Sequence, residues 1–234
     1  MTKMQTEPRA IRRWQAIDWW WNQRLWRVYE FLLSFSWGQR QQHALSHIRG
    51  PRVLEVSFGV GYLMSLYADK YEVTGIDYNP RCVEAARRRL ARRKLQATLL
   101  EGDAHALPFP DASFDTVINT DAFTLYDDPQ AALDEHFRVL TPGGRLILME
   151  YDSPRNGNLR GRMWVFGARN ILAMPRLDLE ALHRKSGFDY QDYDVGGFGA
   201  FHMYVSTKEA RQGAEPLPRP APSMPHAAVP GQSA

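Results

Sequence analysis

The sequence predicts an α/β fold, with one domain built on a mainly parallel, doubly wound sheet of seven strands. The apolar run 53–56 favours a strand covered on both faces, and it leads into a glycine-bearing turn followed by residues with helical spacing. A second strand, 72–77, ends in an acid, where open α/β sheets bind their ligands. With 234 residues, 44% of them hydrophobic, the chain can bury one sizeable core.

Composition divides the chain into three segments. Residues 1–49 form an amphipathic helical segment, expected to act as a lid, and residues 50–208 form the α/β domain. Residues 209–234 contain many prolines, alanines and serines and are unable to bury a core.

The first strand and its turn organise the domain. Gly59 and Gly61 remove side chains where a backbone must approach a ligand, and they permit a positive φ. Apolar residues at helical spacing follow over 63–68, so the segment predicts a strand, a turn and a helix. This arrangement is typical of a nucleotide-binding pocket at the carboxyl end of a strand, facing a helix N-terminus.

Asp77 ends the second strand. A carboxylate there can accept hydrogen bonds from both hydroxyls of a ribose, and Tyr78 follows it where a purine ring would lie. The dinucleotide fingerprint needs glycines at its first, third and sixth positions, and neither the register from Ser57 nor that from Gly59 supplies them. A nicotinamide oxidoreductase is therefore a weaker alternative.

The turn resembles the first motif of the class I S-adenosylmethionine-dependent methyltransferases, an acid followed by alternating glycines, here Glu55, Ser57, Gly59 and Gly61. Ser57 departs from the motif, since it stands where the family usually has its first glycine. The resemblance continues in order through Asp77, the triplet 102–104, the loop 105–115 and the turn 137–146, and it covers about residues 50–150.

The resemblance implies a Rossmann-like sheet with an antiparallel last strand, and S-adenosylmethionine as the cofactor. The residues that it assigns to cofactor binding, apart from the motif itself, are Asp77, Tyr78, Asp103, Ala104, Asn119 and, through a loose match to an N-terminal Tyr-acid pair, Tyr29. Asp103 inherits the place beside the adenine amino group.

The remaining elements follow from periodicity and caps. Expected helices span 39–48, 80–95, 131–140 and 179–186, and expected strands span 99–101, 114–118, 146–151, 190–195 and 201–207. His136 on the third of these helices is expected to be structural.

The exit of the fourth strand is expected to face the reactive methyl group, because exit loops hold the chemistry in open α/β sheets. Asn119 and Asp121 lie there, and Phe123 and Tyr126 are expected to wall the acceptor pocket. For Asp121 a helix cap or a solvated loop acid is an equal alternative.

Methyl transfer needs little acid–base machinery, because the sulfonium is already an activated electrophile. A carbon or phenol acceptor would also need a base, and the candidates are Asp121, Tyr151 and His202. An amine acceptor needs only to arrive unprotonated. A lone histidine such as His202 is more often structural than catalytic.

Residues 153–177 contain five arginines and no acid. Unpaired guanidinium groups there suggest an anionic partner, such as a phosphate, a carboxylate or a lipid headgroup, and Arg155 and Trp164 are the candidates for acceptor binding. The alternative is a basic surface loop without a partner.

Six of the seven tryptophans lie between residues 14 and 37, in a segment whose amphipathic stripe needs only two of them. Residues 1–50 carry eight Lys or Arg against three acids. This composition is typical of an interfacial membrane helix. A lid helix that covers the substrate cavity and packs on its own domain is the favoured interpretation, and both can hold.

Composition also limits the other partners and the location. The arginines between 81 and 94 form a solvated helix face without interleaved aromatic residues, so no nucleic-acid partner is expected. One cysteine, no metal-ligand cluster, no signal-peptide pattern and no long apolar run predict a cytoplasmic protein, with peripheral membrane contact left open.

The sequence therefore predicts methyl transfer to a small amphipathic or lipid-like acceptor, a phospholipid amine or a quinone precursor. The alternatives are a soluble aromatic or polyketide metabolite as the acceptor, and a cofactor-binding protein without catalysis. The acceptor atom and the oligomeric state stay open.

Overall fold

The computed structural model describes residues 40–172, 177–196 and 198–209. The expected N-terminal helix, with Tyr29, lies outside the described residues, as does the proline-rich segment from residue 210 onward.

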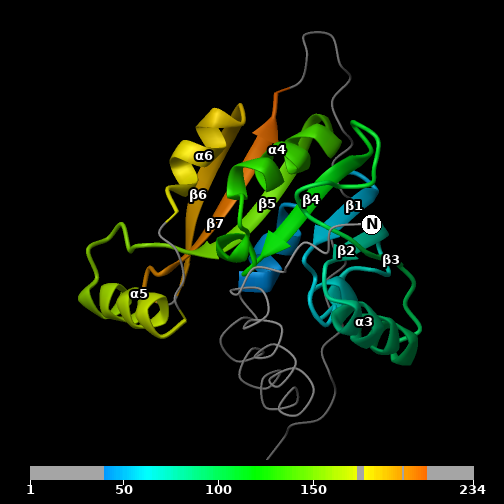
Figure 1. Cartoon of the computed structure of the whole chain (residues 1–234), viewed down its shortest axis with the longest axis horizontal. Coiled ribbons are helices and arrows are strands. Elements are labelled where there is room, and N and C mark those ends of the chain that lie inside the picture. The colour runs from blue at the N-terminus through cyan, green and yellow to red at the C-terminus, as the bar shows by residue number, and fades with distance from the viewer. Residues whose placement is uncertain (1–39, 173–176, 197, 210–234) are drawn as a thin grey trace, which may run out of the picture.

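Seven strands form one sheet in the order β3-β2-β1-β4-β5-β7-β6 (Figure 1). Strands β1 to β5 are parallel, and β7 lies antiparallel between β5 and β6. The strands span Arg52–Val56 (β1), Glu72–Asp77 (β2), Thr98–Glu101 (β3), Phe114–Thr120 (β4), Leu140–Tyr151 (β5), Phe188–Gly196 (β6) and Phe201–Lys208 (β7). The predicted mainly parallel sheet with an antiparallel last strand is confirmed.

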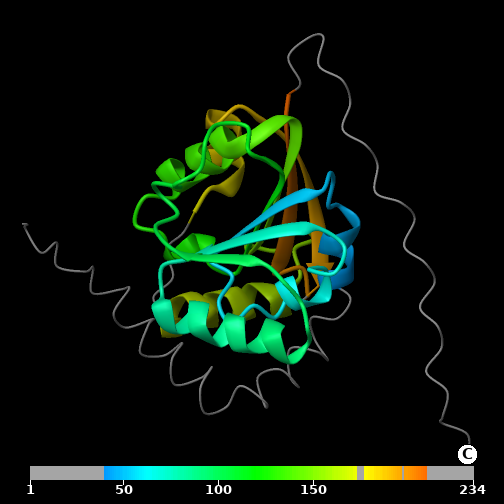
Figure 2. The same ribbon diagram turned by 90° about the vertical axis from the view of Figure 1, so that its right-hand side faces the viewer.

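Helices cover both faces of this sheet (Figure 2). Residues 40–46 are helical, and the named helices span Met64–Leu66 (η1), Pro80–Arg92 (α3), Phe123–Leu125 (η2), Pro129–Val139 (α4), Leu159–Leu172 (α5) and Leu179–Lys185 (α6). One buried cluster joins the sheet to helix 40–46 and α3, and a second joins its other face to α4 and α6. The sheet is therefore doubly wound, with a core on each side.

Side-chain caps precede three of the helices, and α4 begins at Pro129, two residues before its expected start. The side chain of Asn79 accepts from the Arg81 N–H ahead of α3, and the side chains of Asp128 and Asp178 accept from the backbone ahead of α4 and α6. Pro80 and Pro129 occupy the first turns of α3 and α4, where a missing N–H costs nothing.

The helix expected over 63–68 is wrong in extent. The structure has one short 3₁₀ turn, η1, between the glycine turn and β2. The apolar residues of this segment do pack in the core, since Leu63, Met64 and Tyr67 are buried. However, β2 begins at Glu72 and leaves no room for a longer helix. The turn therefore does not lead into a long helix N-terminus.

Helix α5 was not predicted, because its segment was interpreted only as an arginine-rich cover. It begins after Asn158, whose side chain accepts from the Arg160 N–H at 3.0 Å. Among the described residues no helix is both long and apolar enough to cross a bilayer.

Candidate functional site

The turn after β1 is built on three residues with positive φ: Ser57 (+55°), Gly59 (+56°) and Gly61 (+68°). A Cβ on Gly61 would lie 2.8 Å from the Ala86 Cβ of α3, so only glycine permits this packing. A Cβ on Gly59 would meet nothing within 4 Å. The backbone at Gly59 is therefore open to a ligand.

Ser57 is tied to β4 through Tyr126. The Ser57 Oγ lies 2.7 Å from the Tyr126 Oη, and the Asn119 Nδ2 donates to the same phenol oxygen at 2.6 Å. Burial raises the pKa of Tyr126, although its bonds with Ser57 and Asn119 oppose this. The neutral phenol thus joins the ends of β1 and β4, while the Asn119 Oδ1 is buried without a partner among the described residues.

Asp77 lies at the tip of β2 and is oriented by backbone amides. Its Oδ2 accepts from the Gly59 N–H at 2.8 Å, and its Oδ1 accepts from the Asn79 N–H at 2.9 Å. The residue is 8% exposed. The carboxylate therefore lies against the open glycine turn in a fixed orientation.

Two further residues predicted to bind the cofactor, Asp103 and Ala104, lie just after the end of β3. Asp103 is half exposed, and its Oδ1 accepts from the His105 N–H at 2.9 Å and lies 2.6 Å from the His105 Nδ1. Ala104 is buried in the core cluster beside β2. Tyr78 is 45% exposed at the tip of β2. An acid and an aromatic ring therefore lie at adjacent strand ends.

Glu55 is not open to a ligand in this structure. It is 2% exposed, and its Oε2 accepts from the Tyr67 Oη at 2.5 Å. Burial raises the pKa of Glu55 to about 8, although the bond from Tyr67 opposes this. The expectation of a cofactor contact through Glu55 is corrected to a structural role, since its side chain anchors the segment after the turn to β1.

A second polar group lies where β4 and β5 end. The Asp121 N–H donates to the Met149 carbonyl at 2.9 Å, and Glu150, fully buried, accepts from the backbone N–H groups of Thr124 and Tyr151, both at 3.0 Å. Burial raises the pKa of Glu150 to about 7. Asp121 thus lies at the carboxyl edge of the sheet, as predicted.

Phe123 does not wall an open pocket. It is 0% exposed and packs edge-on against Tyr126 and near His136. The expectation from sequence is wrong here, because the η2 turn directs this ring into the core under α4. His136 is buried, with its pKa lowered by burial to about 3, in keeping with a structural residue.

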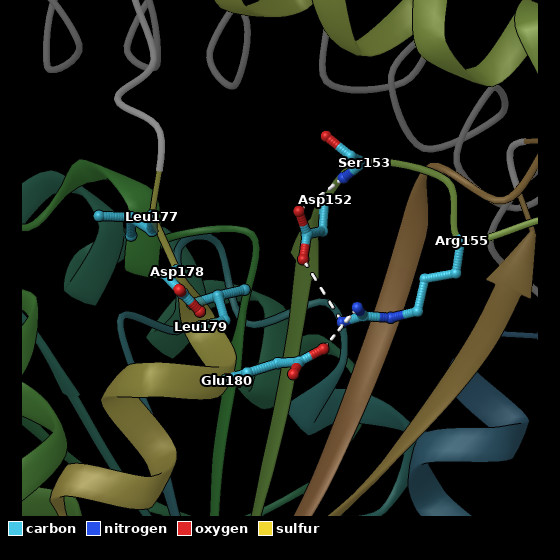
Figure 3. Close-up of a pocket in the computed structure, with 7 residues that line it drawn as sticks. All are labelled: Asp152, Ser153, Arg155, Leu177, Asp178, Leu179 and Glu180. Atoms are coloured by element: carbon cyan, nitrogen blue, oxygen red, sulfur yellow. Dashed lines mark hydrogen bonds and ion pairs between the residues drawn. The ribbon is translucent and has the colours of Figure 1, made fainter. Parts of the chain in front are cut away.

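Arg155 is paired, which corrects the expectation of an unpaired guanidinium. It forms ion pairs with Glu180 of α6, at 2.5 Å, and with Asp192 of β6. Arg155, Glu180 and Asp152 line a cavity of about 480 Å³. Figure 3 shows the Arg155 side chain between those of Asp152 and Glu180. A direct role in acceptor binding stays a prediction that would require Arg155 to exchange partners.

His202 is buried and has acceptors on both sides of its ring. Its Nε2 lies 3.0 Å from the Gly199 carbonyl oxygen, and its Nδ1 lies 2.9 Å from Asp192. Burial lowers the pKa of His202, whereas the hydrogen bond and the charge of Asp192 raise it. Because the raising effects together are larger, the pKa of His202 lies above its ordinary value. Two acceptors suit the imidazolium form, which has no lone pair to serve as a base.

Comparison with known proteins agrees with this geometry. A family model described as a methyltransferase domain matches residues 54–148. The phosphatidylethanolamine N-methyltransferase of Cereibacter sphaeroides is 30% identical over 138 residues, which cover 57% of this chain and 68% of that protein. The chain belongs to the class I S-adenosylmethionine-dependent methyltransferases.

Other relatives share the same region. The demethylmenaquinone methyltransferase of Thermus thermophilus is 36% identical over 134 residues, which cover 56% of this chain and 61% of that protein. The match thus spans less than two thirds of this relative. A solved S-adenosylmethionine-dependent methyltransferase from Thermotoga maritima superposes with a TM-score of 0.64 at 25% identity, over 82% of this chain and 100% of that structure.

The cofactor of this methyltransferase family, S-adenosylmethionine, fits the residues present. The open space at Gly59 accommodates a ligand against the backbone, and the Asp77 carboxylate beside it suits the ribose hydroxyls. The orphaned Asn119 Oδ1 is an acceptor at the same strand edge. Tyr78 and Asp103 lie at the ends of β2 and β3, and their contact with the adenine ring stays a prediction.

Two predicted residues stay outside this account. Tyr29 lies outside the described residues, and Trp164 lies in α5 with a side chain whose position is not described. Tyr151, at the end of β5, contacts the Phe201 ring, with 4.0 Å between the ring centroids. This contact does not test a catalytic role for Tyr151, which stays a prediction.

Proposed function

We propose that this protein transfers the methyl group of S-adenosylmethionine to a small amphipathic acceptor, either a quinone precursor or a phospholipid amine. The observation that carries the proposal is the Asp77 carboxylate, oriented by the Gly59 N–H beside the open glycine turn. Relatives named demethylmenaquinone methyltransferase and phosphatidylethanolamine N-methyltransferase support these two acceptor classes.

Bound S-adenosylmethionine supplies a methyl group on a sulfonium, which needs no further activation. The chain contributes binding and alignment: Asp77 holds the ribose end, and the glycine turn allows close approach of the backbone. Asn119 and the buried edge of β4 and β5 exclude water where the acceptor atom must stand. Proximity and alignment of this kind lower the barrier of a bimolecular displacement, because the reactants are already held in the reactive geometry.

We also propose that the protein acts at an anionic membrane surface. On α5 the side chains of Leu159, Met163 and Phe166 share one face and are 68%, 66% and 70% exposed. Arg160 and Arg162 are exposed on the same helix, and no acid occurs between 153 and 177. An exposed apolar face with arginines fits a lipid surface with anionic headgroups.

Figure 1 shows α5 beyond the edge at which β4 and β5 end. A membrane docked on α5 would therefore lie on the acceptor side of the sheet, where a lipid-like acceptor must enter. The tryptophan- and arginine-rich segment before residue 39 has a composition suited to the same surface.

The methyl-transfer proposal is tested with purified protein, labelled S-adenosylmethionine and a cell extract that is afterwards split into organic and aqueous phases. Label in the organic phase, absent with Asp77→Ala, is the expected result. Label only in the aqueous phase would favour a soluble aromatic acceptor. Cofactor binding without label in either phase would contradict catalysis.

The membrane proposal is tested by flotation with vesicles. The wild-type chain is expected to float with phosphatidylglycerol-containing vesicles and not with pure phosphatidylcholine. The combined variant Leu159→Ser, Met163→Ser, Phe166→Ser should lose most of this binding, whereas the matched control Arg88→Gln, on the exposed face of α3, should keep it. Equal flotation of the triple variant and the wild type would refute a role for α5.

A further inference from the structure

A buried guanidinium lies at the acceptor edge with a donor left unmatched. Arg40, in the helix that precedes β1, is 9% exposed, and its Cζ stands 3.6 Å above the centre of the Phe201 ring. Its Nη1 is buried and has no hydrogen-bond partner among the described residues. A buried donor without a hydrogen-bond acceptor lowers the stability of a folded protein, unless a ligand supplies the acceptor.

A buried acceptor lies near this donor. The Oδ2 of Asp121 is buried and also lacks a partner within the described part of the chain, and Asp121 has a φ of +53°. Burial raises the pKa of Asp121, the charge of Glu150 raises it further, and Arg40 opposes both. The pKa of Arg40 is lowered by burial, against the charges of Asp121, Tyr151 and Asp194. Geometry places both groups next to β5: the Asp121 N–H donates to the Met149 carbonyl of β5, and Arg40 covers Phe201, the ladder partner of the last residue of β5.

Both groups belong to one edge of the sheet. Asp121 follows β4, Tyr151 ends β5, and its ladder partner Phe201 begins the antiparallel strand β7. Arg40 covers Phe201 from helix 40–46. The glycine turn and Asp77 lie at the same edge, because parallel strands end on the same side. A methyl group carried at the turn and an acceptor beside Arg40 would therefore lie at the same edge of the sheet.

The unmatched donor and acceptor define the chemistry of their ligand. A ligand hydroxyl satisfies both, because its O–H donates to the Asp121 carboxylate and its lone pairs accept from the Arg40 N–H. Once the proton has moved, the oxyanion faces a buried cation. An ammonium in the same place would meet the positive charge of Arg40 and leave its N–H unmatched. An unprotonated amine could accept from Arg40 only with the lone pair that must attack the methyl group.

We propose that Arg40 and Asp121 form the acceptor subsite and select an aromatic ring that carries a hydroxyl group, methylated at the carbon next to that hydroxyl. This inference rests on the proposed methyltransferase function and chooses the quinol-like acceptor over the phospholipid amine.

The step balances with the groups present. The acceptor hydroxyl gives its proton to the Asp121 carboxylate, and the electron pair of the oxyanion moves into the ring. The ring carbon next to it forms a bond to the methyl group, while the methyl–sulfur pair stays on sulfur as a thioether. The methylated carbon then loses its hydrogen to water as a proton, and the oxygen takes its proton back from Asp121. The net release is one proton.

The test uses the purified full chain with labelled S-adenosylmethionine and two probes: 1,4-naphthohydroquinol, and phosphatidylethanolamine in detergent micelles. Label is expected on a ring carbon of the hydroquinol and not on the lipid. Arg40→Gln should lower kcat/KM for the hydroquinol by about 100-fold, because a preorganised partner of the oxyanion is lost. Arg40→Lys should recover part of this loss, and the exposed control Arg88→Gln should retain full activity.

Calorimetric titration with S-adenosylhomocysteine and far-UV circular dichroism separate the possible failures. Unchanged cofactor affinity in Arg40→Gln would show that the fold and the cofactor site survive. Methylated phosphatidylethanolamine, or hydroquinol activity indifferent to Arg40, would overturn the inference while the proposed methyl transfer stands. Absence of label on both probes would overturn it as well, and absence of cofactor binding by the wild type would remove the proposed function too.

Discussion

The hydroxyl oxygen of Ser57 lies 2.7 Å from the phenol oxygen of Tyr126. Ser57 occupies a left-handed conformation at the position where its family usually has glycine. Such a conformation costs a residue with a Cβ roughly 1–2 kcal/mol, and one hydrogen bond contributes about 1 kcal/mol in return. The bond to Tyr126 therefore explains how serine can stand in this turn.

Tyr126→Phe is expected to lower the free energy of unfolding by about 1–3 kcal/mol, because the Asn119 amide loses a buried acceptor and Ser57 loses its partner. Urea unfolding measures the change. The matched control is Tyr193→Phe, whose hydroxyl bonds only to Gln191 at the surface and whose removal should cost little. Equal stability of the Tyr126→Phe variant and the wild type would refute the structural role of this bond.

Asp77→Asn is expected to weaken S-adenosylhomocysteine binding by about 10-fold to 100-fold, since charge-assisted hydrogen bonds contribute about 1.5–3 kcal/mol. The Gly59 N–H would also face an amide in place of a carboxylate. Isothermal titration calorimetry measures the affinity. Glu84→Gln, an exposed acid on α3, is the control and should bind normally. An unchanged dissociation constant for Asp77→Asn would remove this carboxylate from the cofactor site.

Glu55→Gln is expected to change how stability depends on pH. The folded pKa of Glu55, about 8, lies above its ordinary value of 4.5, so the unfolded chain loses this proton first as the pH rises. The wild type therefore loses stability relative to Glu55→Gln between about pH 4.5 and 8, by about 5 kcal/mol in total. Urea unfolding of both proteins at pH 4, 6 and 8 measures the difference. A difference that does not change with pH would contradict the raised pKa.

Asp192→Asn is expected to lower the pKa of His202, because the bond and charge of Asp192 oppose the effect of burial. A raised histidine pKa stabilises the fold below the unfolded value of 6.5, and this contribution is lost as the pH rises through the folded value. The variant should therefore lose more stability at pH 6 than at pH 9. Histidine NMR titration reports the pKa directly, and an unshifted His202 resonance would contradict the pairing.

The sequence predicted the sheet and the Asp77 tip because each follows from a local pattern of a few residues. Asp121 was also predicted at the acceptor edge, since exit loops follow strands. These features need no knowledge of distant contacts.

The features that were missed depend on partners far away in the chain. Arg155 was expected to be unpaired, but Glu180 and Asp192 reach it from α6 and β6. Arg40 gave no signal, because its burial depends on Phe201 in β7. Phe123 was expected in a pocket wall, and only the η2 turn directs it into the core.

The place of β7 between β5 and β6 has a consequence for synthesis on the ribosome. Strand β6 pairs with no described strand other than β7, which follows it in the chain. Until residue 208 has left the exit tunnel, β5 keeps an open edge and β6 has no partner. The nascent domain therefore completes its sheet late, and until then its unpaired strand edges would be targets for chaperones.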